Sequence, residues 1–390
     1  MKKFITHWTF AFVTLVVLTY TGLQEPFVKE ILKLKSFDIL IQQEEVELSS
    51  DIGIVTIDEK SIEKYGQWPW KRDVLAQVIT DLRQSGAGVI MIPILFSEED
   101  RLGGDDILSQ TLIDNGVVIA QVGTSQINKN SVPRGVAKIG NPLPYLFEWD
   151  GMLGPIQKLG QNANGVGVIN TAPEIDGVVR RIPLIMRIGE DTYPTMAVEV
   201  IRVATGNPSY QVKAGDGGVQ AIRVPGFPII NTDPNARIWL HWNKTFETIS
   251  AAENNFSKFN GRTVIIGTTA EGLGGIIGTP VGEQYDYMLS ASTLQTMIDG
   301  KQINRYDVSS FLELVLSFVL GILVILISRF TPYWFVGVGM LSLYGMSVYG
   351  SYYLFNQHLI LSDVSWIIIV ITIVGMHSIF NRFILEFRLK

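Results

Sequence analysis

The chain has 390 residues, a formal net charge of -6 and no cysteine. The acidic balance argues against a nucleic-acid partner, and the missing cysteine excludes disulfide bonds, a thiol nucleophile and cysteine-ligated zinc. Of the four histidines, His241 alone lies well away from the apolar segments, so a histidine-based triad or a multi-histidine metal site is nearly excluded. These features favour a binding domain over a catalyst, and we predict no metal site.

The first predicted element is an apolar segment at residues 4–24 that contains no Asp, Glu, Lys or Arg. About twenty apolar residues cross a bilayer as a helix, because each backbone polar group is then satisfied within the segment. Lys2 and Lys3 precede it, as in a signal peptide, but no small-residue cleavage pattern follows. We predict a retained membrane anchor, with a cleaved signal peptide as the alternative.

The long region that follows alternates apolar strand patterns with helical ones. Residues 27–41 predict an amphipathic helix, because apolar side chains recur at helical spacing among Lys and Glu. Strand, helix, strand, helix, strand then predicts a partly parallel sheet covered by helices. The expected strands are 51–58, 89–96, 117–120, 238–242 and 264–267, with helices at 74–84, 105–115, 194–205 and 290–299 and a hairpin at 178–188.

Residues 134–167 are rich in Gly, Pro and Asn, which predicts long surface excursions. No internal repeat at a fixed period is found. We therefore predict one α/β domain, with a weak boundary near residue 130. Its fold class is a mixed-sheet domain inserted between one N-terminal and three C-terminal transmembrane helices.

Three further apolar segments, at residues 311–328, 333–355 and 361–380, predict membrane spans. Cationic residues precede the first span, lie between the second and third, and follow the fourth, whereas the connection 356–359 has none. Cytoplasmic loops carry the excess of Lys and Arg, so four crossings place both termini in the cytoplasm. We expect a multi-pass protein of a bacterial inner membrane, with the large domain in the periplasm or outside the cell.

The predicted boundaries are 1–25 for the cytoplasmic start and first span, 26–306 for the outer domain, 307–381 for the three spans, and 382–390 for a cytoplasmic linker. Glu313 and His377 lie within the spans, where ionisable residues are costly and by default suggest function. Both lie near an interface, so contact with water or headgroups is the alternative.

Two local patterns suggest ligand chemistry but have plainer explanations. The glycine-rich segment 272–278 follows a strand, yet neither a helix nor a phosphate-binding lysine comes after it, so a turned loop is the better interpretation. An acidic cluster at 98–106 does not have the spacing of a calcium loop. Solvated loop and helix cap explain it better than a cation site.

Trp68-Pro69-Trp70-Lys71-Arg72 is more distinctive, because two tryptophans beside two cations can form a platform that stacks on a ligand. The alternative, which we favour, is that both tryptophans fill the core. Arg180 and Arg181 either contact a ligand or tie loops together through carboxylates. The candidate ligand-binding residues are Asp58, Trp68, Trp70, Arg72, Arg180 and Arg181.

Several of these residues fall in motifs that resemble one known family. Residues 54–62 running into 66–72 look like the opening of a type-2 CHASE domain, and the likeness extends over about residues 27–305. The later matching segments are 94–98, 176–184, 193–195, 264–270, 272–273 and 279–280. Two positions depart from the pattern: Gly275 stands where an acidic residue is usual, and 282–291 lacks the usual turn and His-Ala pair.

The resemblance implies an extracellular sensory domain of a bacterial receptor with one span before it and three after it. In such receptors the last span continues into a cytoplasmic effector, commonly a class III adenylate or guanylate cyclase, otherwise a histidine or serine/threonine kinase. Residues 383–390 are similar to the junction before a cyclase domain. We therefore expect the chain to stop short of its effector at Lys390.

On this hypothesis the chain itself holds no catalytic residue and no cofactor, and the cyclase domain that follows would need Mg or Mn. Its expected partners are a second copy in a homodimer or higher oligomer, the lipid bilayer, and an unknown extracellular ligand or protein. A stand-alone membrane scaffold is the alternative, since glycines in the later spans offer close helix packing. Those glycines are Gly337, Gly339, Gly345 and Gly350.

Overall fold

The computed structural model describes residues 8–125 and 128–388. The chain divides into two compact units, one formed by Glu45–Gln302 and the other by Met1–Glu44 with Ile303–Lys390.

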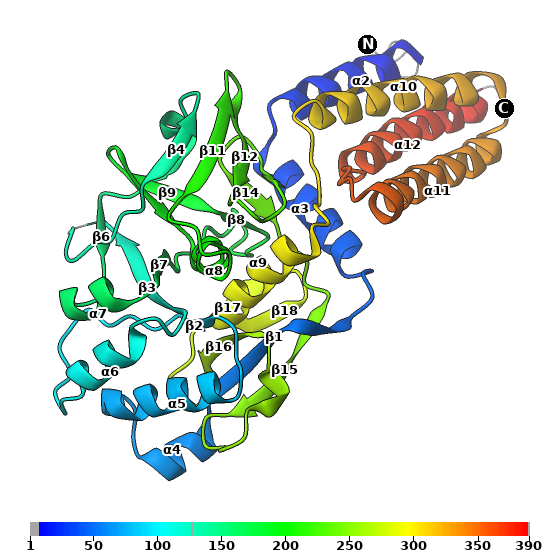
Figure 1. Cartoon of the computed structure of the whole chain (residues 1–390). Helices are drawn as coiled ribbons and strands as arrows, with labels where there is room; N and C mark the ends of the chain where they lie inside the picture. Colours follow the sequence, from blue (N-terminus) through cyan, green and yellow to red (C-terminus); the bar gives the residue numbers. More distant parts are fainter. Residues whose placement is uncertain (1–7, 126–127, 389–390) are drawn as a thin grey trace. The chain divides into compact units, whose positions relative to one another are not determined.

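The Glu45–Gln302 unit is built on a mostly parallel sheet with the strand order β15-β1-β16-β2-β3-β6, and β7 also pairs with β3 (Figure 1). Every pairing in it is parallel except that of β3 with β6. The strands are β1 (Glu47–Ile57), β2 (Ile90–Ile92), β3 (Val117–Thr124), β6 (Gly151–Leu153), β7 (Gly165–Val168), β15 (Lys244–Ser250) and β16 (Thr263–Thr268).

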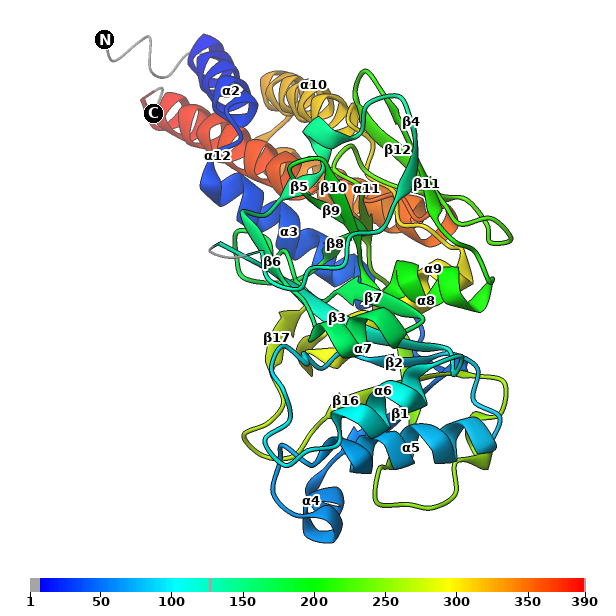
Figure 2. The same cartoon turned by 60° about the vertical axis from the view of Figure 1, so that its left-hand side comes forward.

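Helices cover both faces of this sheet, so its strands are buried on both sides. The helices on one face are α5 (Arg72–Gln84), α6 (Asp105–Leu112) and α7 (Gln157–Asn162), which share one hydrophobic cluster with the strands. On the opposite face α8 (Met196–Ala204) packs on β3 and β7, and α9 (Tyr287–Asp299) packs on β1 and β16 (Figure 2). The short helix α4 (Glu59–Tyr65) follows β1.

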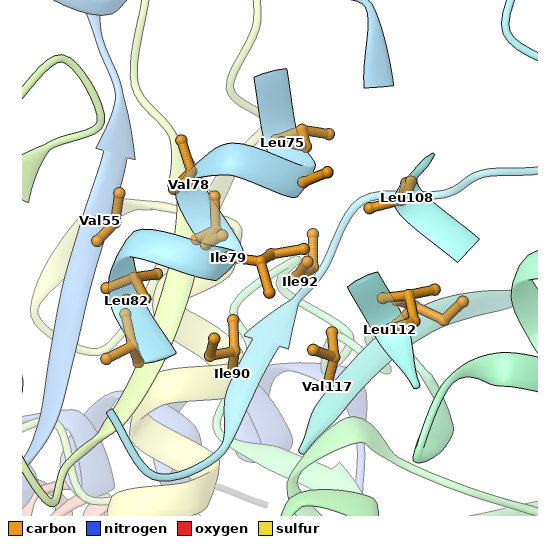
Figure 3. Packing of buried hydrophobic residues seen from close by; sticks show 14 of the residues in the cluster. Val55, Leu75, Val78, Ile79, Leu82, Ile90, Ile92, Leu108, Leu112 and Val117 are labelled. Carbon is orange, nitrogen blue, oxygen red and sulfur yellow. The ribbon is translucent and has the colours of Figure 1, made fainter. Parts of the chain in front are cut away.

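The cluster between α5 and the sheet forms because the apolar residues of α5 recur at helical spacing on one side. Figure 3 shows Leu75, Val78, Ile79 and Leu82 of α5 packed against strand residues such as Ile90. The four helix residues are at most 3% exposed. The sequence pattern that predicted helix 74–84 is thus the pattern that holds the helix on the sheet.

Smaller sheets complete the unit and make its architecture mixed. The first contains β4 (Val136–Ile139), β11 (Tyr210–Gly215), β12 (Gly218–Arg223) and β13 (Ile230–Asn231), and the second contains β5 (Phe147–Glu148), β9 (Ile185–Ile188) and β10 (Asp191–Pro194). Two further sheets have two strands each: β8 (Arg181–Pro183) pairs with β14 (Arg237–Trp239), and β17 (Ile276–Thr279) pairs with β18 (Gly282–Tyr285). The unit also contains two short 3-10 helices, η1 (Leu143–Tyr145) and η2 (Ser257–Phe259).

The predicted α/β class with a partly parallel sheet is confirmed, but two local predictions are wrong. Residues 178–188 do not form a hairpin, because β8 pairs with β14 while β9 pairs with β10. The hairpin is β9–β10, where Gly189 has a φ of 57° in the tight turn. The region 134–167 is not only surface loop, since β7 enters the sheet and Val166 is 1% exposed.

The second unit is helical. Its helices are α2 (Trp8–Leu23), α3 (Phe27–Ile41), α10 (Ser309–Phe330), α11 (Tyr333–His358) and α12 (Ser365–Arg388). Among the described residues, Ser309–Phe330 and Ser365–Ile384 are long and apolar enough to cross a membrane. The bent pair of α2 and α3, at 77°, adds a third candidate if it is one span. Residues 4–7 of the predicted first span lie outside the described residues.

The chain is therefore a membrane protein with two or three candidate spans. Helix α11 has 26 residues, but tyrosine, glycine and serine lower its mean hydropathy, so the predicted span at residues 333–355 stays a prediction. The close packing of α10 on α2 depends on a small residue, because a Cβ on Gly321 would lie 2.4 Å from Leu15.

The two ionisable residues of the predicted spans both have partners within the helical unit. Glu313 forms an ion pair with Arg305. The hydroxyl of Thr14 lies 3.0 Å from His377 Nδ1, and the ring of Phe10 meets His377 edge-on at 5.0 Å. Glu313 is therefore neutralised by a partner within the helical unit.

Candidate ligand-binding groove

At the carboxyl edge of the large sheet, the chain leaves neighbouring strands toward opposite faces of the sheet. From β1 and β2 it continues into α5 and α6 on one face, whereas from β16 it reaches α9 on the other face. Strands whose continuations part in this way leave a crevice at their carboxyl ends, and open α/β sheets bind ligands there. The candidate residues are therefore placed relative to this edge.

Asp58 follows β1 at this edge and caps helix α4. Its Oδ1 accepts hydrogen bonds from the Ser61 backbone N–H at 3.0 Å, the Ser61 hydroxyl at 2.7 Å and the Ser250 hydroxyl at 2.7 Å. Burial alone would raise the pKa of Asp58, but these hydrogen bonds outweigh it and hold the pKa below its ordinary value. The arrangement explains Asp58 as a helix cap that also ties β15 to β1.

Replacing Asp58 with alanine is expected to lower the free energy of unfolding by about 1 kcal/mol near neutral pH, because the α4 cap is lost. A carboxyl whose pKa is lowered on folding contributes stability above its unfolded pKa, here 3.8, and loses it as the pH falls through the folded pKa. The gap between wild type and variant should therefore shrink in acid.

Urea unfolding of the purified chain at about pH 7 and about pH 3 measures this gap. K60A, at an exposed position of the same helix, is the matched control. An equal loss at both pH values would show that the charge of Asp58 contributes nothing.

The two tryptophans lie against the core of the α5 face. Trp70 is 4% exposed, its indole N–H donates to the Gly66 carbonyl at 2.7 Å, and its ring meets Trp68 and Tyr65 edge-on at 5.3 and 5.1 Å. Trp68 is half-buried against the same cluster, and the Trp68-Pro69 peptide bond is cis. This placement favours the interpretation that the tryptophans fill the core.

Arg72 begins α5 and fastens the acidic loop to it. Its guanidinium donates to Asp105 and to the Glu98 carbonyl and lies 5.2 Å from the centre of the Phe96 ring, while its backbone N–H donates to Asp100 at 2.8 Å. Two of the clustered carboxylates are thus occupied by protein donors. Within the described part of the chain, no group of His, Cys, Asp and Glu is arranged to hold a metal ion.

Arg180 and Arg181 each bind a carboxylate with two hydrogen bonds, and they belong to the region of β8, outside the large sheet. Arg180 is fully buried and bonds both oxygens of Asp176 at 2.8 Å. Arg181 bonds Glu174 at 2.6 and 2.9 Å, and its guanidinium lies 4.8 Å from the Trp239 ring centre. These partners favour the interpretation that both arginines tie loops together.

A groove of about 590 Å³ opens between α6 and α7, beside the acidic loop. The N–H of Ile156 donates to the carbonyl of Phe96, which follows β2, so the start of α7 lies at the carboxyl edge of the sheet. The groove is lined by Glu99, Gly103, Gly104, Asp105, Asp106, Ile156, Gln157, Lys158, Gln161 and Asn162. Its volume is in the range of about 300–1,000 Å³ that small-molecule sites occupy.

The groove is polar, and only some of its groups are already paired. Lys158 forms an ion pair with Asp106, and this hydrogen bond raises the pKa of Lys158. Asn162 donates to Ser109 of α6 at 2.6 Å, which joins the two helices. The side chains of Gln157 and Gln161 are exposed and bond to no other described residue. Two free amides beside an ion pair suit a hydrophilic ligand.

Sequence reasoning missed the α7 half of the groove. Gln157 to Asn162 fall in the region predicted to be surface loop, and no motif distinguishes them. For the acidic half, the sequence predicts a solvated loop with a helix cap, and a cation site as the less favoured alternative. The acidic loop lies near α7 because the Ile156 N–H bonds to the Phe96 carbonyl, a long-range contact that leaves no pattern in the sequence.

The glycine-rich segment 272–278 leads into the hairpin β17–β18 and not directly into a helix, as expected for a turned loop. A Cβ on Gly275 would lie 2.5 Å from Oδ2 of Asp286. A side chain at position 275 would thus meet the carboxylate of Asp286, which lies beside the glycine.

Comparison with known families gives one match. The family model described as CHASE2 domain matches residues 10–328, which is more than half of the chain. No curated protein and no solved structure matches the chain significantly.

Proposed function

The chain belongs to the CHASE2 domain family and is a membrane sensor, and we propose that its outer domain regulates a cytoplasmic effector, a class III adenylate cyclase that makes cAMP. The observation that carries the proposal is the path of the chain after the sheet. Helix α9 packs on β1 and β16 and then leads, through residues 300–308, into the membrane helix α10. A change at the sheet thus has a covalent route to a membrane span.

The groove between α6 and α7 is the proposed site of the signal. Its free amides and ion pair suit a small hydrophilic molecule, and its volume is that of a small-molecule site. A ligand shifts an equilibrium between two states only by its difference in affinity for them. The ligand must therefore bind more tightly when α6 and α7 are arranged as in one signalling state.

Cyclases of class III act as paired catalytic domains, so the proposal includes a homodimer or a higher oligomer. It also places the outer domain in the periplasm, as the distribution of Lys and Arg around the spans favours. A histidine or serine/threonine kinase as the effector, or a stand-alone membrane scaffold, is the alternative function.

The complete gene product, expressed in a bacterium that lacks its own adenylate cyclase, is expected to raise cellular cAMP. Q161W places a large side chain in the groove and is expected to change that output, because the ligand can no longer enter. The matched control is Q77W, at an exposed glutamine of α5 outside the groove. Immunoblots show whether all forms reach the membrane equally.

The possible results separate the two parts of the proposal. A gene product that makes no cAMP but labels itself with phosphate from ATP would replace the cyclase with a kinase. Equal cAMP output from Q161W and Q77W would remove the groove from the mechanism and leave the effector assignment standing.

A further inference from the structure

The helical unit contains a second cavity, which is apolar and opens between α2 and α10. Its volume is about 430 Å³. It is lined by Trp8, Phe12, Ile322, Ile325, Leu326, Arg329 and Phe330. Because α10 is a candidate membrane span, this groove faces a medium of lipid chains.

The groove lies along the C-terminal part of α10. Its lining on this helix runs from Ile322 to Phe330, and Arg329 lies in the last turn. A helix rises about 1.5 Å per residue, so this lining spans about 12 Å along the helix axis. That is less than half of the roughly 30 Å hydrocarbon core of a bilayer, so the groove stays within one leaflet.

The only charged residue that lines the groove, among those described, lies at its end. Arg329 is exposed and makes no hydrogen bond or ion pair with another described residue. Trp8 and Phe330 lie at the same end and are 49% and 79% exposed, as is common for aromatic side chains at headgroup level. A guanidinium binds phosphate with two parallel hydrogen bonds.

We propose that this groove binds an anionic phospholipid, with one acyl chain between α2 and α10 and the phosphate on Arg329. The apolar wall accepts part of the chain, and the groove stays within one leaflet. Arg329, which pairs with no other described residue, selects a negative headgroup at the mouth. A transmembrane helix of another protein fits less well, because its contact would continue past Ile322 into the other leaflet.

The test uses the full chain, purified in mild detergent and offered equal amounts of phosphatidylglycerol and phosphatidylcholine. Native mass spectrometry counts the lipids that stay bound. The wild type is expected to retain phosphatidylglycerol about fivefold better, the ratio that corresponds to roughly 1 kcal/mol for one cation at a membrane surface. R329Q should retain both lipids about equally, and R329K should keep the preference.

A groove-filling variant tests the acyl-chain contact separately. L326W is expected to lose both lipids, because its indole occupies the space of the chain. K60Q, which removes an exposed cation from the outer domain, is the control for net charge. The proposal is overturned if the wild type shows no headgroup preference, if R329Q keeps it, or if L326W binds lipid as the wild type does while unfolding at the same temperature.

Discussion

Replacement of Glu313 with alanine is expected to destabilise the helical unit by about 3–5 kcal/mol, the usual result of breaking a buried ion pair. The guanidinium of Arg305 bonds both carboxylate oxygens of Glu313, and the side chains are only 13% and 15% exposed. Without Glu313 the guanidinium would remain largely shielded from water and without a carboxylate partner. Thermal unfolding of the purified chain in detergent measures the loss.

The same ion pair fixes the segment that leads into α10 against the connection between α11 and α12. Arg305, in the segment between α9 and α10, also donates to the Leu361 carbonyl at 3.1 Å and lies 5.3 Å from the Phe37 ring centre. The Asp363 N–H donates to Glu313 at 2.6 Å. Glu313 therefore joins the segment that enters α10 to the α11–α12 connection.

A double-mutant cycle separates coupling from general damage. R305A and E313A should each cost several kcal/mol, whereas the double variant should cost much less than their sum, because no buried charge is left unpaired. E283A, at an exposed carboxylate of the outer unit, is the control. Additive losses, or an E313A protein as stable as the wild type, would contradict this account.

The parts of the fold that the sequence predicted are those with strong local patterns. Leu75, Val78, Ile79 and Leu82 repeat at helical spacing, so helix α5 is visible without any knowledge of its neighbours. Val166, in contrast, lies in the short run 165–168 between glycines. Its burial comes from pairing of β7 with β3, a long-range contact that leaves no periodic signal in so short a segment.

The candidate site divides in the same way. Asp58 was predicted only as a ligand-binding residue, and its capping box with Ser61 emerges from the structure. For Arg180 and Arg181, the sequence predicted contact with carboxylates as one alternative, but not that Asp176 and Glu174 are the partners. The groove was not foreseen, because Gln157 and Gln161 matter through their position beside the acidic loop and not through any motif.

Loss of the Arg180–Asp176 ion pair is expected to lower the free energy of unfolding of the outer unit by about 3–5 kcal/mol. Arg180 is fully buried, the side chain of Asp176 is 8% exposed, and two hydrogen bonds of 2.8 Å join them. D176A leaves the buried guanidinium without the carboxylate of Asp176. If Arg180 instead served a ligand, D176A would change binding while the fold kept most of its stability.

The ion pair of Arg187 and Glu148 is a control that has the same hydrogen-bond geometry but is more exposed to solvent. Its two hydrogen bonds are 2.8 and 2.7 Å long, but the Glu148 side chain is 50% exposed. Exposed ion pairs contribute about 0–1 kcal/mol, because water screens the charges and solvates either partner when the other is removed.

Urea unfolding of D176A and E148A therefore measures the effect of burial with the chemistry held constant. We expect E148A to lie within about 1 kcal/mol of the wild type, and D176A several kcal/mol below it. Equal small losses would mean that water reaches Arg180 in solution, and Arg180 would return as a candidate for ligand contact.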